Sequence, residues 1–174
     1  LQQNDIAIDL STNAEHFFLE DSFLPSIAEN RFASIGGNGK FVLVEAPYAG
    51  PVPRLHDIVF RLKVKGVTPV IAHPERCLEF EKKGRAAEIA ASGALFQLDV
   101  GALIGRYGRA PQKLARSMLD DDLYAIAATD LHASVKAVEW VGESMALLEK
   151  LVGSARLHKL FGETPRKILA GESV

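Results

Sequence analysis

The sequence predicts an α/β fold in which strands and helices alternate along one domain that covers all 174 residues. Three observations predict it. Short runs rich in valine, isoleucine and leucine recur at 40–45, 67–72, 94–100 and 123–129. Segments with helical spacing of apolar residues separate these runs, and no repeat, low-complexity tract or linker interrupts the chain. Strands that alternate with helices indicate parallel βα units, arranged as a barrel or as a doubly wound sheet.

The chain up to Gly66 is expected to contain two strands and one helix. Isoleucine and leucine alternate with polar residues within 5–14, a strand-like pattern that ends at Glu15. A glycine-rich turn at 36–39 precedes the strand at 40–45. The segment 53–65 places its apolar residues on one helical face, and Gly66 is expected to end that helix.

The second half of the chain is expected to contain four helices around the remaining strands. The segment 84–92 predicts a short helix, and Pro111 is expected at the start of another over 111–119. Ser134 is expected to be the N-cap of a long helix that reaches about residue 152. The last helix is expected between Thr164 and Gly171, with proline just inside its start and glycine just past its end.

Composition and charge exclude several classes of protein. The net charge is −2, the pI is about 6.2, and basic residues form no stripe, which argues against nucleic-acid binding. No apolar run reaches the roughly 20 residues that span a bilayer. The single cysteine, Cys77, fits a reducing compartment, so a cytoplasmic protein is expected. The chain starts with neither methionine nor a leader pattern, so we expect the natural N-terminus to lie upstream.

Acidic and imidazole side chains recur where the predicted strands end. They are Glu15, Glu45, His73, Asp130 and His132. A lone histidine at a strand end is more often a hydrogen-bonded structural residue, and a lone glutamate is more often solvated. Together, however, they would meet at one rim, because the carboxyl ends of parallel strands converge. Carboxylates with imidazoles suit Mn, Fe or Zn, and paired ions of this kind support phosphoryl transfer.

Four segments also resemble a known family. Residues 69–76 read PVIAHPER, which closely resembles the signature of the bacterial tyrosine phosphatases of capsule and exopolysaccharide synthesis, within the PHP (polymerase and histidinol phosphatase) superfamily. Residues 129–133 (TDLHA), 14–18 (AEHFF) and 37–45 (ending VLVE) resemble further elements of that family, in the same order. The octapeptide is the specific element, and the resemblance covers nearly the whole chain.

The resemblance implies a distorted (βα) barrel of the PHP type and a role for each residue of the rim. Glu15 would bridge two metal ions, with Glu45 and His73 completing one of them. Asp130 would serve the other ion and His132 a third. Arg76 would contact the phosphoryl group, a role that suits a planar guanidinium because it pairs bidentately with two oxygens. The alternative for Arg76 is a structural salt bridge with a neighbouring glutamate, Glu75 or Glu79.

The function that the resemblance implies is metal-dependent hydrolysis of phosphate monoesters. The substrate would be phosphotyrosine on a bacterial tyrosine autokinase, with Mn as the expected metal and Fe or Zn as alternatives. Two other functions stay open: a small-molecule phosphatase of the same superfamily, acting on a compound such as histidinol phosphate, and a non-catalytic interaction module. A cysteine-based phosphatase is excluded. Its C-x5-R motif would need arginine six positions after Cys77, and this position is Lys83.

The chain departs from the family pattern at its start. The family begins with an H-x-H metal motif, and none of the five histidines here forms one. The barrel is therefore expected to lack its first βα units, with an incomplete metal cluster and little activity for the 174-residue chain alone. Exposed strand edges would favour a homo-oligomer. In the glycine-rich segment 101–108, Arg106 or Tyr107 could face the substrate mouth, although a plain loop is the simpler interpretation.

Overall fold

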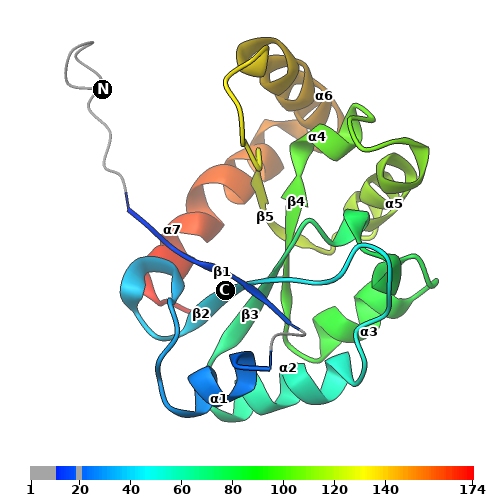
Figure 1. Ribbon diagram of the computed structural model, residues 1–174. Coiled ribbons are helices and arrows are strands. Elements are labelled where there is room, and N and C mark those ends of the chain that lie inside the picture. The colour runs from blue at the N-terminus through cyan, green and yellow to red at the C-terminus, as the bar shows by residue number, and fades with distance from the viewer. Residues whose placement is uncertain (1–10, 19–20) are drawn as a thin grey trace.

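The computed structural model describes residues 11–18 and 21–174 and contains a five-stranded sheet in the order β1-β2-β3-β4-β5. Every pair of neighbouring strands is parallel. The strands are β1 (Glu15–Phe17), β2 (Phe41–Glu45), β3 (Thr68–Ala72), β4 (Leu95–Asp99) and β5 (Tyr124–Ala128). The predicted α/β class with parallel strands is confirmed (Figure 1).

Helices connect the strands and cover the sheet (Figure 1). The α-helices are α1 (Phe23–Ala28), α2 (Leu55–Val64), α3 (Arg85–Ala91), α4 (Val100–Leu103), α5 (Arg109–Asp120), α6 (Ala137–His158) and α7 (Thr164–Ala170). Short 3-10 turns are η2 (Ile35–Gly37), η3 (Pro74–Arg76) and η4 (Leu78–Phe80), and a π-helical turn, η5 (Lys159–Glu163), joins α6 to α7. In the part of the chain that is described, no helix has the length and apolar character needed to cross a bilayer.

The two faces of the sheet bury different cores. Side chains alternate along each strand, so Val42 and Val44 join a large core that also contains side chains of α2, α3 and α5. Phe41 and Leu43 point to the other face, where Val70 and Ile168 complete a smaller apolar cluster. The smaller cluster does not extend to the carboxyl ends of the strands. Towards the carboxyl ends of the strands this face is occupied by polar residues instead.

A bulge in β5 adapts its side chains to these two faces. The pairing with β4 shifts between Phe96, which lies beside Tyr124, and Gln97, which lies beside Ile126. Tyr124 therefore joins the large core while Ile126 joins the small cluster, although residues two apart in a regular strand share a face. The bulge sets the register with which the chain reaches Asp130.

A tight turn after η2 holds the C-terminal helix against the sheet. The side-chain amide of Asn38 donates to the carbonyls of Ile168 at 2.8 Å and Leu169 at 3.1 Å, in the last turn of α7 where carbonyls lack the usual helical partners. Gly36 has φ +68°, and a Cβ atom there would collide with the Leu169 carbonyl oxygen. Glycine is needed at this position for both its conformation and its lack of a side chain.

Three boundaries differ from those that the sequence predicts. Glu15 begins β1 rather than ending a strand over 5–14, and residues 5–10 of that prediction lie outside the described part of the chain. Ser134 is not an N-cap, because α6 begins after Lys136 in a left-handed conformation and without a side-chain cap. The same helix continues past residue 152 to His158, with a kink at Gly153 where φ is 77°. The sequence interpretation ended this helix just before Gly153, whereas the chain stays helical beyond that glycine.

Candidate active site

All five parallel strands of the described sheet deliver polar side chains to one edge of it. Glu45 is the last residue of β2, His73 follows β3, and Asp99 ends β4. Asp130 lies two residues past the end of β5. Glu15 reaches the same edge although it begins β1, because β1 pairs only with the end of β2, from Leu43 to Glu45. The predicted convergence at the carboxyl ends of the strands is therefore present.

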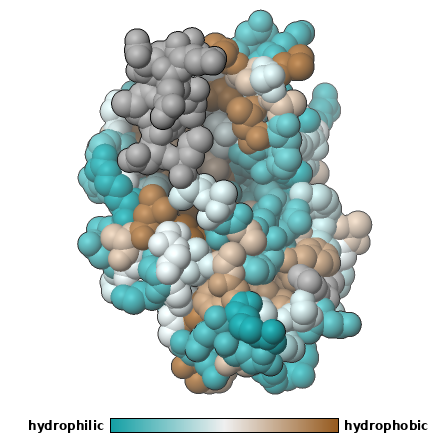
Figure 2. Space-filling view, turned by 60° about the vertical axis from the view of Figure 1, so that its left-hand side comes forward, coloured by the Kyte–Doolittle hydropathy of each residue, from teal (hydrophilic) through white to brown (hydrophobic). Residues whose placement is uncertain are grey.

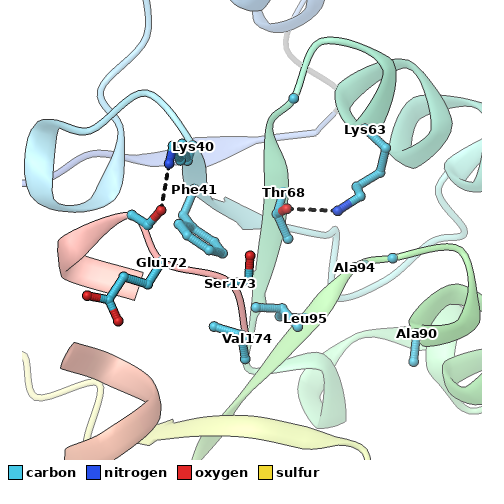
Figure 3. A pocket seen from close by; sticks show the side chains of 13 residues that line it. Lys40, Phe41, Lys63, Thr68, Ala90, Ala94, Leu95, Glu172, Ser173 and Val174 are labelled. Atoms are coloured by element: carbon cyan, nitrogen blue, oxygen red, sulfur yellow. Dashed lines mark hydrogen bonds between the residues drawn. The ribbon is translucent and has the colours of Figure 1, made fainter. Parts of the chain in front are cut away.

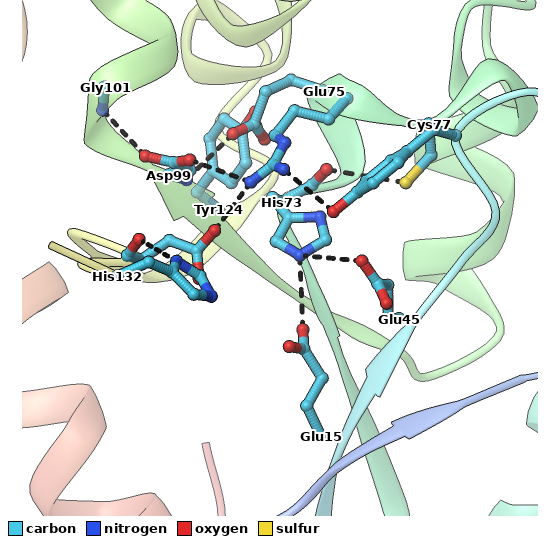
Figure 4. Close-up of polar contacts among 12 residues, drawn as sticks. Glu15, Glu45, His73, Glu75, Cys77, Asp99, Gly101, Tyr124 and His132 are labelled. Atoms are coloured by element: carbon cyan, nitrogen blue, oxygen red, sulfur yellow. Dashed lines mark hydrogen bonds and ion pairs between the residues drawn. The ribbon is translucent and has the colours of Figure 1, made fainter. Parts of the chain in front are cut away.

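His73 is the centre of the cluster on the β1–β3 side (Figure 4). Its Nε2 lies 3.3 Å from Oε1 of Glu15 and 3.5 Å from Oε1 of Glu45. The imidazole is buried, whereas the two carboxylates are about one-third exposed (33% and 29%). His73 has φ +32° and Asp130 has φ +46°, left-handed conformations that are unfavourable for residues with a side chain and that concentrate at functional sites.

The groups around His73 shift the pKa of its imidazole. Burial lowers its pKa, but the hydrogen bond with Glu15 and the charges of Glu15 and Asp130 outweigh burial, so the pKa is raised above its ordinary value. Nδ1 of His73 is buried and has no hydrogen-bond partner in the described part of the chain. A buried, unpartnered ring nitrogen is uncommon and indicates that the ring is held here for a purpose other than its own hydrogen bonds.

The donor types at this cluster fit a divalent metal ion, although their present arrangement does not form a metal site. Two carboxylates and an imidazole nitrogen are ligands that Mn, Fe and Zn share. Within residues 11–18 and 21–174, no three His, Cys, Asp or Glu side chains are arranged as ligands around a common point. Glu15 and Glu45 instead point their oxygens at Nε2 of His73. The same atoms that would face an ion are thus turned toward one another.

Arg76 occupies the other side of the site, next to the second group of carboxylates. Its Nη1 donates to Oδ2 of Asp130 at 2.7 Å and lies 3.4 Å from Oδ2 of Asp99. Its Nη2 donates to the hydroxyl of Tyr48 at 2.9 Å. The guanidinium also lies between two aromatic rings, 4.8 Å from the centroid of Tyr48 and 4.3 Å from that of Tyr107. The ion-pair partners are therefore Asp99 and Asp130 rather than the neighbouring glutamates considered from the sequence.

Those two glutamates have other partners. Glu79 pairs with Arg85 at 2.6 Å and accepts from the backbone of Val52. Glu75 is buried and accepts hydrogen bonds from the backbone N–H of Asp99 and from the hydroxyl of Tyr124, both at 2.9 Å. Burial raises the pKa of Glu75 to about 7, although these hydrogen bonds oppose the shift. Glu75 thus fastens the turn that carries Arg76 to β4 and β5.

The remaining predicted ligand, His132, lies at the rim of the site. Its ring is 82% exposed, and Nδ1 lies 3.8 Å from Oδ1 of Asp130. The same nitrogen is 2.8 Å from the backbone carbonyl of Asp130. The structure therefore brings His132 to Asp130 but not to the group formed by Glu15, Glu45 and His73. Its predicted role as a ligand of a third ion stays a prediction.

Cys77 has the environment of a structural residue. Its thiol is buried and donates to the backbone carbonyl of Ala46 at 3.3 Å. Burial raises the pKa of Cys77 to about 12, with further contributions from the nearby carboxylates of Glu75 and Glu45. A thiol with such a pKa is not a nucleophile at neutral pH, which agrees with the sequence argument against a cysteine-based mechanism.

Two cavities lie at opposite ends of the sheet. One of about 240 Å³ opens at the site and is lined by Arg76, Asp130 and His132. A larger one of about 480 Å³ lies at the amino ends of the strands (Figure 3). In the larger cavity Lys40 donates to the carbonyl of Gly171 and Lys63 to the hydroxyl of Thr68, so both cations already have partners. The smaller cavity is the one that shares residues with the candidate site.

Two side chains of the candidate site, Asp99 and Tyr48, were missed by the sequence interpretation. Asp99 carries the signal that identified the others, since it is an acidic residue near the end of a predicted strand. Tyr48 lies in a loop with no pattern around it, so only its tertiary contact with Arg76 identifies it, whereas Tyr107 was considered as a residue of the substrate mouth and does contact Arg76. Burial, followed by a hydrogen bond with Glu45, raises the pKa of Tyr48, so this phenol links Glu45 to Arg76.

The fold and this cluster define a parallel α/β protein with a carboxylate and imidazole site at the carboxyl ends of its strands. The chain belongs to the capsular polysaccharide synthesis family CpsB/CapC, which matches residues 1–170. The family resemblance drawn from the PVIAHPER segment is thereby confirmed.

Two relatives are tyrosine-protein phosphatases by name. The chain is 31% identical over 138 residues to YwqE of Bacillus subtilis (strain 168), a match that covers 78% of this chain and 53% of YwqE. It is 26% identical over 163 residues to CpsB of Streptococcus pneumoniae, with coverage of 90% and 63%. The chain thus spans a little over half of the first relative and less than two thirds of the second.

A solved structure has a similar fold. It comes from a study of YwqE from Bacillus subtilis and CpsB from Streptococcus pneumoniae, described there as unique metal-dependent tyrosine phosphatases. The TM-score is 0.84 at 24% sequence identity, and the match covers 99% of this chain and 69% of that one. The parallel α/β arrangement is therefore shared over nearly all of the present chain.

Proposed function

We propose that the protein is a metal-dependent phosphatase that hydrolyses phosphotyrosine on a protein substrate. One observation carries the proposal: Arg76, which lines the small cavity, is held by Asp130 beside the cluster of Glu15, Glu45 and His73. The relatives named tyrosine-protein phosphatases support the choice of phosphotyrosine as the substrate.

Arg76 is the residue that would bind the phosphoryl group. Its bonds to Asp99, Asp130 and Tyr48 fix the plane of the guanidinium and leave further N–H donors for phosphoryl oxygens. Because the group is permanently charged and already oriented, it would stabilise the charge that develops on those oxygens in the transition state. Tyr48 and Tyr107 confine it between their rings and exclude water from both sides.

Glu15, Glu45 and His73 would hold one metal ion. Glu15 would also serve a second ion together with Asp130, and His132 would serve a third. When bound, such ions activate a water molecule and stabilise the oxygens of the phosphate ester. The exposed carboxylates of Glu15 and Glu45 can turn away from His73, which would free its Nε2 for a ligand. The donor set suits Mn, Fe and Zn alike. Mn is the proposed metal because the family resemblance favours it, and Fe and Zn are the alternatives.

Four further points belong to the proposal. The sheet would form part of a distorted (βα) barrel of the PHP type, in a single domain over residues 1–174. The substrate protein would be a bacterial tyrosine autokinase. The protein would work in the cytoplasm, which the single, unpaired cysteine supports. Self-association as a homo-oligomer would use the outer edge of β1, which pairs only with β2 in the described part of the sheet.

The experiment is a comparison of two substrates in the presence and absence of Mn²⁺. A phosphotyrosyl peptide should be hydrolysed faster than histidinol phosphate, and EDTA should abolish both reactions. Preference for histidinol phosphate would favour a small-molecule phosphatase instead. Absence of turnover with either compound, in a version extended upstream and shown to contain metal, would favour an interaction module.

A further inference from the structure

The cavity at the candidate site contains two guanidinium groups. Arg76 lies at the end next to Asp130 and His132, and Arg106 lies at the end formed by α6. Its volume of about 240 Å³ is below the roughly 300–1,000 Å³ of pockets that hold a whole small ligand. It is therefore suited to one or two side chains of a larger substrate.

Arg106 is held in place by contacts on two sides. Its Cζ lies 4.1 Å from the centroid of the Trp140 ring, and that ring is only 8% exposed. Its aliphatic part lies against Gly101, where an added Cβ would be 2.8 Å from Cδ of Arg106. Arg106 is exposed, so stacking on this ring restricts the guanidinium but leaves it accessible, and binding a ligand costs less conformational entropy.

The charge of Arg106 is not balanced as that of Arg76 is. Arg76 contacts two carboxylates, Asp99 and Asp130. Among the described residues, Arg106 has contacts with Trp140 and Tyr107 but no ion pair with a carboxylate. An oriented cation that faces a cavity without its own counter-ion is suited to an anionic group from a ligand.

The two cations lie at different parts of the Tyr107 ring. Arg76 lies over its face, 4.3 Å from the centroid, whereas Arg106 interacts with its hydroxyl. Burial and, next, the interaction with Asp99 raise the pKa of Tyr107 to about 12, and Asp99 also contacts Arg76. A phosphoryl group bound by Arg76 beside the His73 cluster would therefore leave Arg106 available for a second anion.

We propose that Arg106, stacked on Trp140, determines specificity by binding an acidic side chain next to the phosphotyrosine of the substrate. The inference rests on the proposed phosphotyrosine phosphatase function. Leu131, Val135 and Trp140 form an apolar part of the cavity wall, and Leu131 and Val135 are exposed. They would pack against the aliphatic part of that acidic side chain and reduce the screening of its charge by water.

The test uses two peptides that differ in one residue. Each carries a phosphotyrosine mimic that resists hydrolysis, and the adjacent residue is glutamate in one and glutamine in the other. The protein with Mn²⁺ should bind the glutamate peptide about fivefold to tenfold more tightly, as expected for one charge-assisted hydrogen bond. Arg106→Ala should remove this difference, and Arg106→Lys should restore only part of it because an ammonium cannot stack as a planar fork does.

The control is Arg109→Ala, which removes an exposed arginine from the same segment and should preserve the difference between the peptides. Equal binding of both peptides by the unsubstituted protein would overturn the role of Arg106 and leave the proposed function intact. A fall in p-nitrophenyl phosphate turnover with Arg106→Ala would also overturn it, since the residue would then act on the phosphoryl group. Failure of both peptides to bind would contradict the proposed function itself, and the role of Arg106 with it.

Discussion

Arg76 and Asp130 form a 2.7 Å ion pair between residues that are 54 positions apart in the sequence. The pair joins the turn after β3 to the loop after β5, and both side chains are mostly buried, each with 17% of its surface exposed. A guanidinium that is only partly exposed interacts more strongly with a carboxylate than a surface pair does. The contact therefore both orders the loop that carries His132 and orients the group proposed to bind phosphate.

Substituting Arg76 should affect turnover rather than metal binding. Arg76→Ala is expected to lower kcat by about 10²-fold, the loss typical of one group that stabilises developing charge. Metal content should be unchanged, because Arg76 is not a ligand. Steady-state kinetics and elemental analysis of the purified variant measure both. Arg54→Ala, at an arginine on the surface of the protein, is the control and should retain full turnover. Unchanged kcat in Arg76→Ala would assign Arg76 to its ion pairs alone.

Two tyrosine-to-phenylalanine changes should separate stability from activity. Tyr124→Phe removes a hydrogen bond from the buried Glu75 and should lower the free energy of unfolding by about 1–3 kcal/mol. Tyr48→Phe removes the half-exposed hydroxyl that orients Arg76 and should lower kcat about tenfold with little effect on unfolding. Urea unfolding and kinetics on both variants measure the two effects. The reverse pattern would mean that Glu75, not Tyr48, positions Arg76.

Much of the fold follows from local sequence patterns. The runs at 40–45 and 67–72 are short, apolar and bounded by glycine, so their boundaries agree with β2 and β3 to within one residue. The end of α6 was placed too early because Gly153 is a usual stop signal, and only packing beyond it keeps the chain helical. Glu15 was expected to end a strand, but it begins β1. Its position depends on pairing with the end of β2, a tertiary contact that the local pattern does not contain.

The candidate site was predictable where a residue lies at the end of a strand and not otherwise. His73 and Glu45 converge because parallel strands place their carboxyl ends at one edge. The partners of Arg76 could not be deduced in the same way. Its nearest acidic residue in sequence, Glu75, turns inward to Tyr124, while Asp99 comes from a different strand. The carboxylate that pairs with an arginine depends on the directions of both side chains, and the sequence pattern does not contain these directions.

Cys77 should be inert in the folded protein. Its thiol is buried and its pKa is raised to about 12, so almost none of it is thiolate at pH 8. Iodoacetamide should therefore modify Cys77 only after unfolding, as followed by mass spectrometry with and without urea. Cys77→Ser should leave turnover nearly intact, since a hydroxyl can also donate to the Ala46 carbonyl. Rapid labelling of the native protein would contradict this description of the site.

Metal binding should stabilise the protein through the His73 cluster. Mn²⁺ at about a hundredfold excess over its Kd should add about 2.7 kcal/mol, which for a chain of this size corresponds to a rise in Tm of about 5–10 °C. Glu45→Gln replaces one of the carboxylates beside Nε2 of His73 and should remove most of that rise. Glu81→Gln, at an exposed glutamate after η4, is the matched control and should keep this rise in Tm.

Thermal unfolding is measured for each protein with Mn²⁺ and with EDTA, and the two Tm values are subtracted. The difference is the relevant quantity because Glu45→Gln can change the Tm of the metal-free protein by itself. An equal rise in Tm for Glu45→Gln and the unsubstituted protein would show that the ion binds elsewhere, and Glu45 would then not be a ligand.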